Sequence, residues 1–131
     1  MKILEVKIEK IKPYIKNPRK NQAIEKVASS IKEFGFRQPI VVDKDNVIIA
    51  GHTRFAASKL LGLKKVPIHV ADNLTERQIM AYRIADNRVA QDAEWDSDLL
   101  GVELEELSKL DFDLDLLGFE TNEIDNLILN N

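Results

Sequence analysis

The chain contains no cysteine, which excludes disulfides, thiolate catalysis and cysteine-ligated zinc. Its two histidines, His52 and His69, lie far apart in the sequence, which argues against a histidine-rich metal site. No run of about 18 apolar residues occurs, and residues 1–14 lack the apolar core of a signal peptide. We therefore expect a protein of the reducing cytoplasm that does not span a membrane.

Glycine and proline are also scarce, with five and four residues among 131, while 44% of the residues are hydrophobic and 31% are charged. This composition is typical of a folded globular protein of ordinary domain size. A domain of this length buries about two-thirds of the surface of its unfolded chain, so it needs no disulfide or metal to fold.

Basic residues are almost missing from the last third of the chain. Residues 1–90 contain 18 Lys and Arg against 9 Asp and Glu, a net charge of +9. Residues 91–131 contain only Lys109 against 13 Asp and Glu, a net charge of −12, and the two values sum to the overall −3. A basic body favours a polyanionic partner, whereas an acidic tail repels one or shields the body. We expect two parts, a core domain over 1–90 and an acidic helical extension over 91–131.

Hydrophobic periodicity and turn residues predict the order strand, helix, hairpin, helix, strand, and then helices only. This order lacks the regular alternation of a doubly wound sheet and predicts a mixed α/β (α+β) fold, a small mixed sheet with packed helices. The leucines Leu100, Leu104 and Leu107 share a helix face that either packs internally or forms a homodimer contact. We expect strands over 3–8, 38–42, 47–50 and 66–70, and helices over 24–34, 52–61, 75–89, 95–107 and 121–128.

The junction at Gly51 has the chemistry of an anion site. Residues 47–50 are all apolar, as in a strand buried on both faces, and a helix follows the glycine. Glycine lets a ligand approach the backbone, and the first turn of a helix offers free N–H groups and positive dipole charge. His52, Thr53 and Arg54 add an imidazole, a hydroxyl and a guanidinium, so a phosphate or carboxylate would fit. The alternative is an ordinary strand–glycine–helix junction with a surface arginine.

A second group of polar residues falls on the helix predicted over 75–89. Arg83, Asp86 and Asn87 share one face of that helix by their spacing. Asp86 and Asn87 could hold Mg²⁺ beside a bound phosphate, because magnesium prefers oxygen ligands. The alternative is an Arg83–Asp86 pair on a solvated helix face.

Three stretches together resemble the N-terminal domain of the ParB/sulfiredoxin superfamily over about residues 2–90. They are the run 38–42 (QPIVV), the run 49–57 (IAGHTRFAA) and the run 61–67 (LGLKKVP). The run 85–88 (ADNR) lies where ParB proteins carry a Glu-Asn motif. Residues 93–96 and 112–114 look like the sequence after this domain in phage and prophage proteins that carry a DNA methyltransferase behind it.

The resemblance implies a compact mixed α/β domain that binds a nucleoside triphosphate with Mg²⁺. By position, the phosphates would lie at Gly51, His52, Thr53 and Arg54. Asp86 and Asn87 would lie near the metal. Gln38 and Pro39 would line the nucleotide side of the pocket, and Asn87 and Arg88 complete the expected binding residues.

The chain also departs from the pattern of that superfamily. ParB proteins have Glu-Arg-Arg after the glycine, where this chain has His52-Thr53-Arg54, and Asp86 replaces a Glu. Sulfiredoxin places its catalytic cysteine in this turn, so the lack of cysteine excludes sulfinic-acid reduction. We expect that residues 91–131 do not form the helix-turn-helix with which partition proteins read DNA.

The preferred reading is a nucleotide- or phosphate-binding module of a phage or mobile-element DNA modification or partition system. An NTPase or phosphotransferase that uses His52 or Asp86 for proton transfer is an alternative. A second alternative is a ParB-like nuclease or non-specific DNA binder that uses the basic body, although no carboxylate cluster suited to two-metal cleavage is evident. The expected partners are a nucleotide, DNA, and a methyltransferase domain or a second copy.

Overall fold

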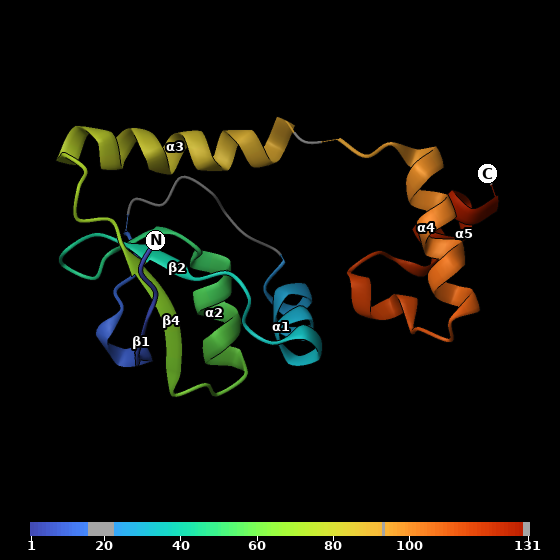
Figure 1. Ribbon diagram of the computed structural model, residues 1–131, viewed down its shortest axis with the longest axis horizontal. Helices are drawn as coiled ribbons and strands as arrows, with labels where there is room; N and C mark the ends of the chain where they lie inside the picture. The colour runs from blue at the N-terminus through green and yellow to red at the C-terminus, as the bar shows by residue number, and fades with distance from the viewer. Residues whose placement is uncertain (16–22, 93, 130–131) are drawn as a thin grey trace. The chain divides into compact units, whose positions relative to one another are not determined.

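The computed structural model describes residues 1–15, 23–92 and 94–129. The chain divides into two compact units, Met1–Asp92 and Ala93–Asn131 (Figure 1). The elements of the first unit are β1 (Leu4–Lys7), η1 (Ile8–Lys10), α1 (Ile24–Phe34), β2 (Ile40–Val42), β3 (Ile48–Ala50), α2 (His52–Leu60), β4 (Lys65–Val70) and α3 (Glu76–Asp92). Those of the second unit are α4 (Ser97–Lys109), η2 (Leu114–Leu117) and α5 (Thr121–Leu129).

The first unit is built on a mixed four-stranded sheet in the order β1-β4-β2-β3. β1 pairs antiparallel with β4, β4 pairs parallel with β2, and β2 and β3 form the antiparallel hairpin expected from the sequence. The turn of the hairpin uses Asn46 at a φ of 64°, a conformation that asparagine tolerates well. The predicted mixed α/β fold is therefore confirmed.

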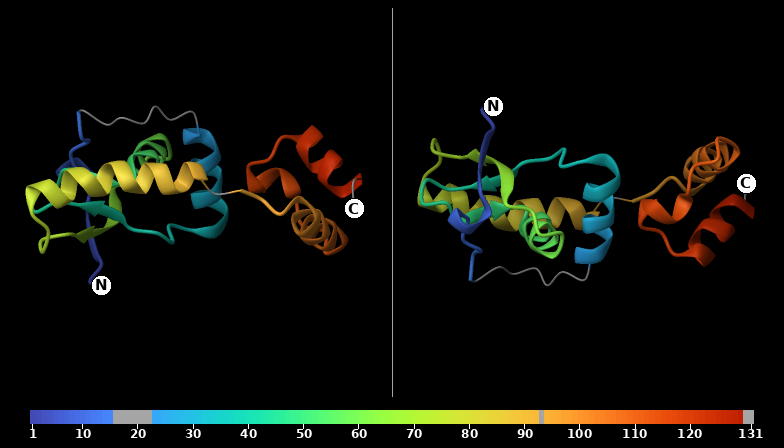
Figure 2. Two further views of the ribbon diagram at one scale, coloured as in Figure 1. Left: turned by 90° about the horizontal axis from the view of Figure 1, so that it is seen from above. Right: turned by 90° about the horizontal axis from the view of Figure 1, so that it is seen from below.

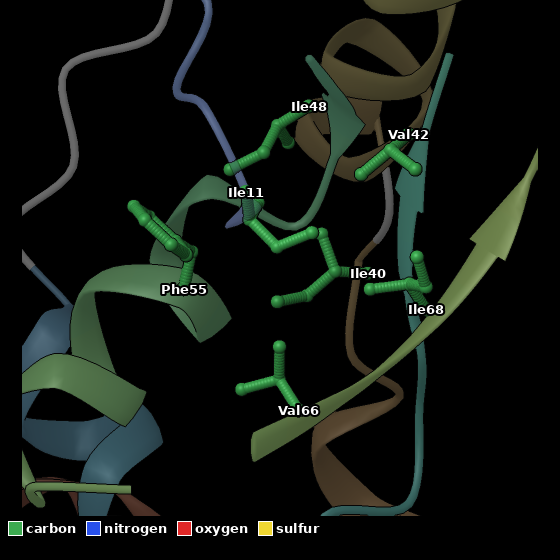
Figure 3. Packing of buried hydrophobic residues seen from close by; sticks show 7 residues of the cluster. All are labelled: Ile11, Ile40, Val42, Ile48, Phe55, Val66 and Ile68. Atoms are coloured by element: carbon green, nitrogen blue, oxygen red, sulfur yellow. The ribbon is translucent and has the colours of Figure 1, made fainter. Parts of the chain in front are cut away.

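The core of the first unit lies between the sheet and α2. Alternate strand residues supply most of it, because neighbouring side chains on a strand point to opposite faces. Each fully buried Ile, Val or Phe contributes roughly 1.5–3 kcal/mol. Figure 3 shows the cluster of Ile11, Ile40, Val42, Ile48, Phe55, Val66 and Ile68.

Helices cover the sheet on both sides. α2 contacts β2 and α1 packs against α2, while α3 contacts β3. Figure 2 shows α3 on the side of the strands opposite to α2. Because α3 covers it, β3 is buried at all three positions, although it is the last strand in the sheet order.

Short sequence signals define the ends of these helices. Gly35 ends α1 with a φ of 84° and donates its N–H to Ile31 O at 2.8 Å. The run Thr75-Glu76-Arg77-Gln78 has the sequence pattern of a capping box, and this box opens α3. Thr75 N donates to Gln78 Oε1 at 2.9 Å, and Gln78 N donates to Thr75 Oγ1 at 3.2 Å. No helix of the described residues is long and apolar enough to cross a membrane.

The second unit is a small pair of packed helices with its own core. Leu104 of α4 and Ile124 of α5 are 1% and 5% exposed, so the predicted leucine face packs within the unit at Leu104. As a good capping residue just before an apolar stretch, Thr121 is predicted to be the N-cap of α5, and this prediction is wrong. The helix begins at Thr121 itself, and Glu120 N donates to Glu123 Oε1 at 2.9 Å because Glu123 lies one turn ahead.

Candidate phosphate-binding site

Gly51 joins β3 to α2 in a conformation that requires glycine. Its φ is 107°, in the left-handed region that other residues rarely adopt. A Cβ built there would lie 3.1 Å from Arg54 Nη2 and 3.3 Å from Ile40 Cα. Both the backbone angle and the tight space therefore disfavour a side chain at this position.

The first turn of α2 presents unpaired donors beside this glycine. The first hydrogen bond of the helix runs from Phe55 N to Gly51 O at 2.9 Å, so the N–H groups of residues 52–54 have no carbonyl of the helix as partner. Gly51 as the N-cap provides no side chain, and the first turn contains no acidic residue. The positive end of the helix dipole is thus open to an anion.

Arg54 brings residues from two other segments to the same place. Its Nη1 donates to Gln38 Oε1 at 3.4 Å and its Nη2 donates to Pro39 O at 3.3 Å. Both bonds are longer than the usual 2.9–3.0 Å or so of an N–H···O bond, and Nε, which is buried, has no partner among the described residues. The guanidinium is therefore held in place but only weakly satisfied.

Two residues of α3 affect the pKa of Arg54. Burial lowers the pKa of the guanidinium below its usual value, and the nearby charges of Asp86 and Tyr82 offset part of that change. An arginine remains protonated in proteins even so. The structure thus places Asp86, predicted as a metal ligand, near the predicted phosphate ligand Arg54.

A pocket of about 260 Å³ adjoins the site on the side of α1. Arg54 and Gln38 form one wall, and α1 with the loop after it forms the rest. Sequence reasoning missed this wall, although Gly35 and Arg37 directly precede Gln38 and could have indicated it. The lining residues are Val27, Ser30, Ile31, Phe34, Gly35, Phe36, Arg37, Gln38 and Arg54.

His52 binds the backbone of a distant segment. Its Nε2 accepts the N–H of Tyr14 at 3.1 Å, which requires that nitrogen to carry no proton. Burial lowers the pKa of the imidazole, and the positive charge of Arg83 lowers it further. His52 is therefore neutral at pH 7, and its Nε2 is occupied by a structural bond.

The interpretation of Arg83 as part of a solvated helix face is wrong. The residue is 7% exposed, and its Nε donates to Ile48 O at 3.2 Å. Its charged partner is Asp43, with Nη2 and Oδ2 3.9 Å apart, and not Asp86. The helical period correctly predicts which residues share a face of α3, but only the fold shows that β3 covers that face.

The remaining predicted residues lie together on α3. Asp86 and Arg88 are exposed, while Asn87 is half-buried and donates its Nδ2 to Arg83 O at 3.1 Å. That bond leaves the amide oxygen of Asn87 for another partner. Among the described residues no group of three or more His, Cys, Asp or Glu side chains could hold a metal ion. A magnesium ion held by Asp86 and Asn87 would need further oxygen ligands from outside these two side chains.

Two family models match the chain. The ParB N-terminal domain matches residues 1–88, and the ParB-methyltransferase HTH domain matches residues 98–130. The second match corrects the expectation that residues 91–131 form no helix-turn-helix. That expectation rested on acidic composition, whereas the match covers the segment that folds as α4, η2 and α5.

Curated proteins similar to this chain include the following two. The ParB-like nuclease domain-containing protein YnaK of Escherichia coli is 34% identical over 80 residues, which are 60% of this chain and 92% of the relative. A probable chromosome-partitioning protein ParB of Campylobacter jejuni is 39% identical over 88 residues, or 63% of this chain. The match covers only 31% of that partition protein.

Solved structures with the same fold include two of special interest. The C-terminally truncated ParB of Caulobacter crescentus, complexed with CTP-γ-S, has a TM-score of 0.79 and 25% identity and covers 98% of this chain and 77% of its own. Sulfiredoxin from Arabidopsis thaliana has a TM-score of 0.52 and 23% identity, covers 63% of this chain and 97% of its own, and shows the fold alone.

Proposed function

The chain belongs to the ParB N-terminal domain family, and from this membership and the geometry of the Gly51 turn we propose that it binds a nucleoside triphosphate. The phosphates lie over Gly51 and the first turn of α2, where Thr53 adds a hydroxyl. The observation that carries the proposal is the state of Arg54, a half-buried cation with two long hydrogen bonds and a buried Nε without a partner among the described residues.

An anion improves this arrangement in energetic terms. A hydrogen bond to a charged group contributes about 1.5–3 kcal/mol, against about 1 kcal/mol for an ordinary neutral bond. Exchange of the long contacts with Gln38 and Pro39 for bonds to phosphate oxygens is therefore favourable. The missing Cβ at Gly51 leaves the backbone open to a ligand at the same point.

In the proposed complex, the base, the sugar and the metal lie around the phosphates bound at the Gly51 turn. Gln38 and Pro39 lie on the side of the base and sugar, next to the pocket formed with α1. Asp86 and Asn87 are the residues that would hold Mg²⁺ through their oxygens, and Arg88 adds positive charge on α3. The CTP-γ-S bound by the Caulobacter ParB supports a cytidine nucleotide as the first ligand to test.

Calorimetry with each of the four ribonucleoside triphosphates, with Mg²⁺ and with EDTA, tests the proposal. Arg54→Ala should weaken binding by roughly ten- to hundredfold, since it removes one or two charge-assisted bonds. Arg77→Ala is the matched control, because Arg77 is an exposed guanidinium in the first turn of α3. If no nucleotide binds, or if both variants behave alike, the proposal fails.

Hydrolysis is an alternative in which His52 or Asp86 transfers a proton. The bond from Tyr14 N to His52 Nε2 occupies one imidazole nitrogen, which favours Asp86 for that role. Phosphate release above background that Asp86→Asn and Asn87→Ala both abolish would support hydrolysis. A flat time course at saturating nucleotide would leave binding alone.

DNA binding by the first unit is a second candidate function, and a pair of lysines favours it. Lys7 and Lys65 are direct cross-strand partners, an arrangement in which like charges repel. Lys64 lies beside them, since its carbonyl accepts the N–H of Ile8 at 2.9 Å. A row of exposed lysines at one end of the sheet suits a phosphate backbone.

The test is duplex affinity against salt concentration. Replacement of both Lys7 and Lys65 by Gln should weaken binding and lower the slope of log affinity against log salt by about two. Lys32→Gln is the control, because Lys32 is an exposed lysine of α1. If the slope is unchanged in the double variant, DNA binding through these lysines is refuted, and so is a nuclease that uses the same surface.

The match to the ParB-methyltransferase HTH domain favours a role in DNA modification over partition. We place the chain with a DNA methyltransferase of phage or mobile-element origin, either as a separate partner or in the same polypeptide. Co-purification with a DNA methyltransferase from the same source would support this role. Sedimentation analysis with and without nucleotide tests the accompanying idea of a homodimer.

A further inference from the structure

Arg83 is a buried cation that contacts three separate parts of the first unit. Its Nε donates to Ile48 O in β3 at 3.2 Å, and its Nη2 lies 3.9 Å from Asp43 Oδ2 in the hairpin turn. Its guanidinium carbon lies 3.7 Å from the centre of the Tyr14 ring. Burial of an arginine is costly unless the protein uses the charge and the planar shape together.

Two of these contacts, those with Tyr14 and Ile48, lead on to the Gly51 site, and the backbone of Arg83 contacts a third residue near it. Tyr14, which stacks on the guanidinium, donates its N–H to His52 Nε2 at the start of α2. Ile48 begins the strand that ends immediately before Gly51. Asn87 lies one turn further along α3 and donates its Nδ2 to the main-chain carbonyl of Arg83 at 3.1 Å, so the position of its amide oxygen follows the part of α3 that the Arg83 side chain anchors on β3.

We propose that Arg83 is a positioning residue that fixes Asn87 and the start of α2 in one geometry. The positioning role of Arg83 rests on the contacts described above. Its effect on ligand binding rests on the proposed nucleotide function. Arg83 touches neither phosphate nor metal. It fixes two other groups: Asn87 on α3, which would hold the metal in the proposed function, and the Gly51 turn, which would bind the phosphates. In this way Arg83 couples metal binding to phosphate binding.

The shape of the arginine side chain is essential to this role. A planar guanidinium stacks on an aromatic ring while its edge donates to a carbonyl and faces a carboxylate, whereas a lysine ammonium is a compact point charge. Ile48 N is also bound, as a donor to Lys12 O at 2.9 Å. Arg83 therefore satisfies the one remaining backbone group of Ile48 on the outer side of β3, and lysine cannot satisfy all three partners at once.

The first part of the test uses the protein without nucleotide. In Arg83→Lys we expect the Tyr14 amide to exchange with solvent at least about tenfold faster. The reason is that no guanidinium stacks on the Tyr14 ring in this variant, so the hydrogen bond from Tyr14 N to His52 Nε2 opens more often. The Asn87 side-chain amide signals should shift as well, because this part of α3 loses the bond that anchors it on β3. Arg77→Lys on the same helix is the control. If neither signal changes in Arg83→Lys, the inference is overturned whatever the nucleotide binding shows.

The second part measures nucleoside triphosphate affinity with Mg²⁺ and with EDTA. Arg83→Met should abolish most of the gain in affinity from Mg²⁺, as Asn87→Ala should, and the double variant should be no worse than either. Additive losses, or a Mg²⁺ gain that survives in Arg83→Met, would overturn the coupling. If Arg83→Met does not fold, the same cycle with Arg83→Lys decides. A wild-type chain that binds no nucleotide would contradict the proposed function, and with it the coupling, while the exchange data still decide the positioning role.

Discussion

Replacement of Gly51 by alanine separates the structural demand of this turn from its proposed role in binding. A non-glycine residue in the left-handed region is strained by about 1–3 kcal/mol. The new Cβ would also lie 3.3 Å from Ile40 Cα, a backbone atom in the core, so β2 or α2 has to shift. The nearer contact, 3.1 Å from Arg54 Nη2, is with a side chain that can move away.

Gly62→Ala is a matched control for this variant. Gly62 has a φ of 72°, and a Cβ there would meet no atom within 4 Å. It therefore carries the backbone strain alone. For a unit of this size each kcal/mol of destabilisation lowers Tm by roughly 4–8 °C. We expect both variants to lose stability, with the larger loss in Gly51→Ala.

The binding assay gives the sharper contrast between the two variants. In Gly51→Ala the methyl group occupies the space through which an anion approaches the backbone, and it displaces Arg54 from its contacts with residues 38 and 39. We expect nucleotide affinity to fall by at least about tenfold beyond any effect of unfolding, which corresponds to about 1.4 kcal/mol. In Gly62→Ala affinity should be unchanged. Equal Tm values and equal affinities for the two variants would refute the reasoning about this turn.

The remaining predictions concern His52 and the acidic unit. The folded pKa of His52 lies below the unfolded value of about 6.5, so its contribution to stability is present above that pH and is lost as the pH falls. His52→Gln should reduce the loss of Tm between pH 7.5 and 5, both roughly one unit or more from that value; an unchanged loss of Tm would refute this. Truncation after Asp92 should raise duplex affinity at low salt if the acidic unit shields the basic one, and equal affinity in gel-shift titrations would count against shielding.

Much of the fold could be predicted because its signals are local. The capping box at Thr75 and Gln78 and the apolar strand before Gly51 each combine a propensity and a spacing within a few residues. The structure confirms both features. Local signals of this kind identify elements well, because nothing distant competes with them.

The features that were missed depend on contacts between distant residues. Arg83 is buried because Ile48, Asp43 and the Tyr14 ring meet around it, and none of these lies within 30 residues of it in the sequence. The same reason applies to the pocket wall from α1, which meets Arg54 only after α1 packs on α2. Helical period predicts which residues share a face, but it does not predict what covers that face.

The helix-turn-helix match has to be reconciled with the charge of the same segment. Between residues 98 and 130 one lysine stands against ten acidic residues, and α5 contains Glu123 and Asp125 but no Lys or Arg. Most contacts of a protein with DNA go to phosphates and need cations or neutral donors, so this surface is repelled by a duplex. The first unit, with its lysines at the β1–β4 edge, has the charge that DNA requires. The family match therefore describes how residues 98–130 fold, while the charge points to the first unit for any contact with DNA.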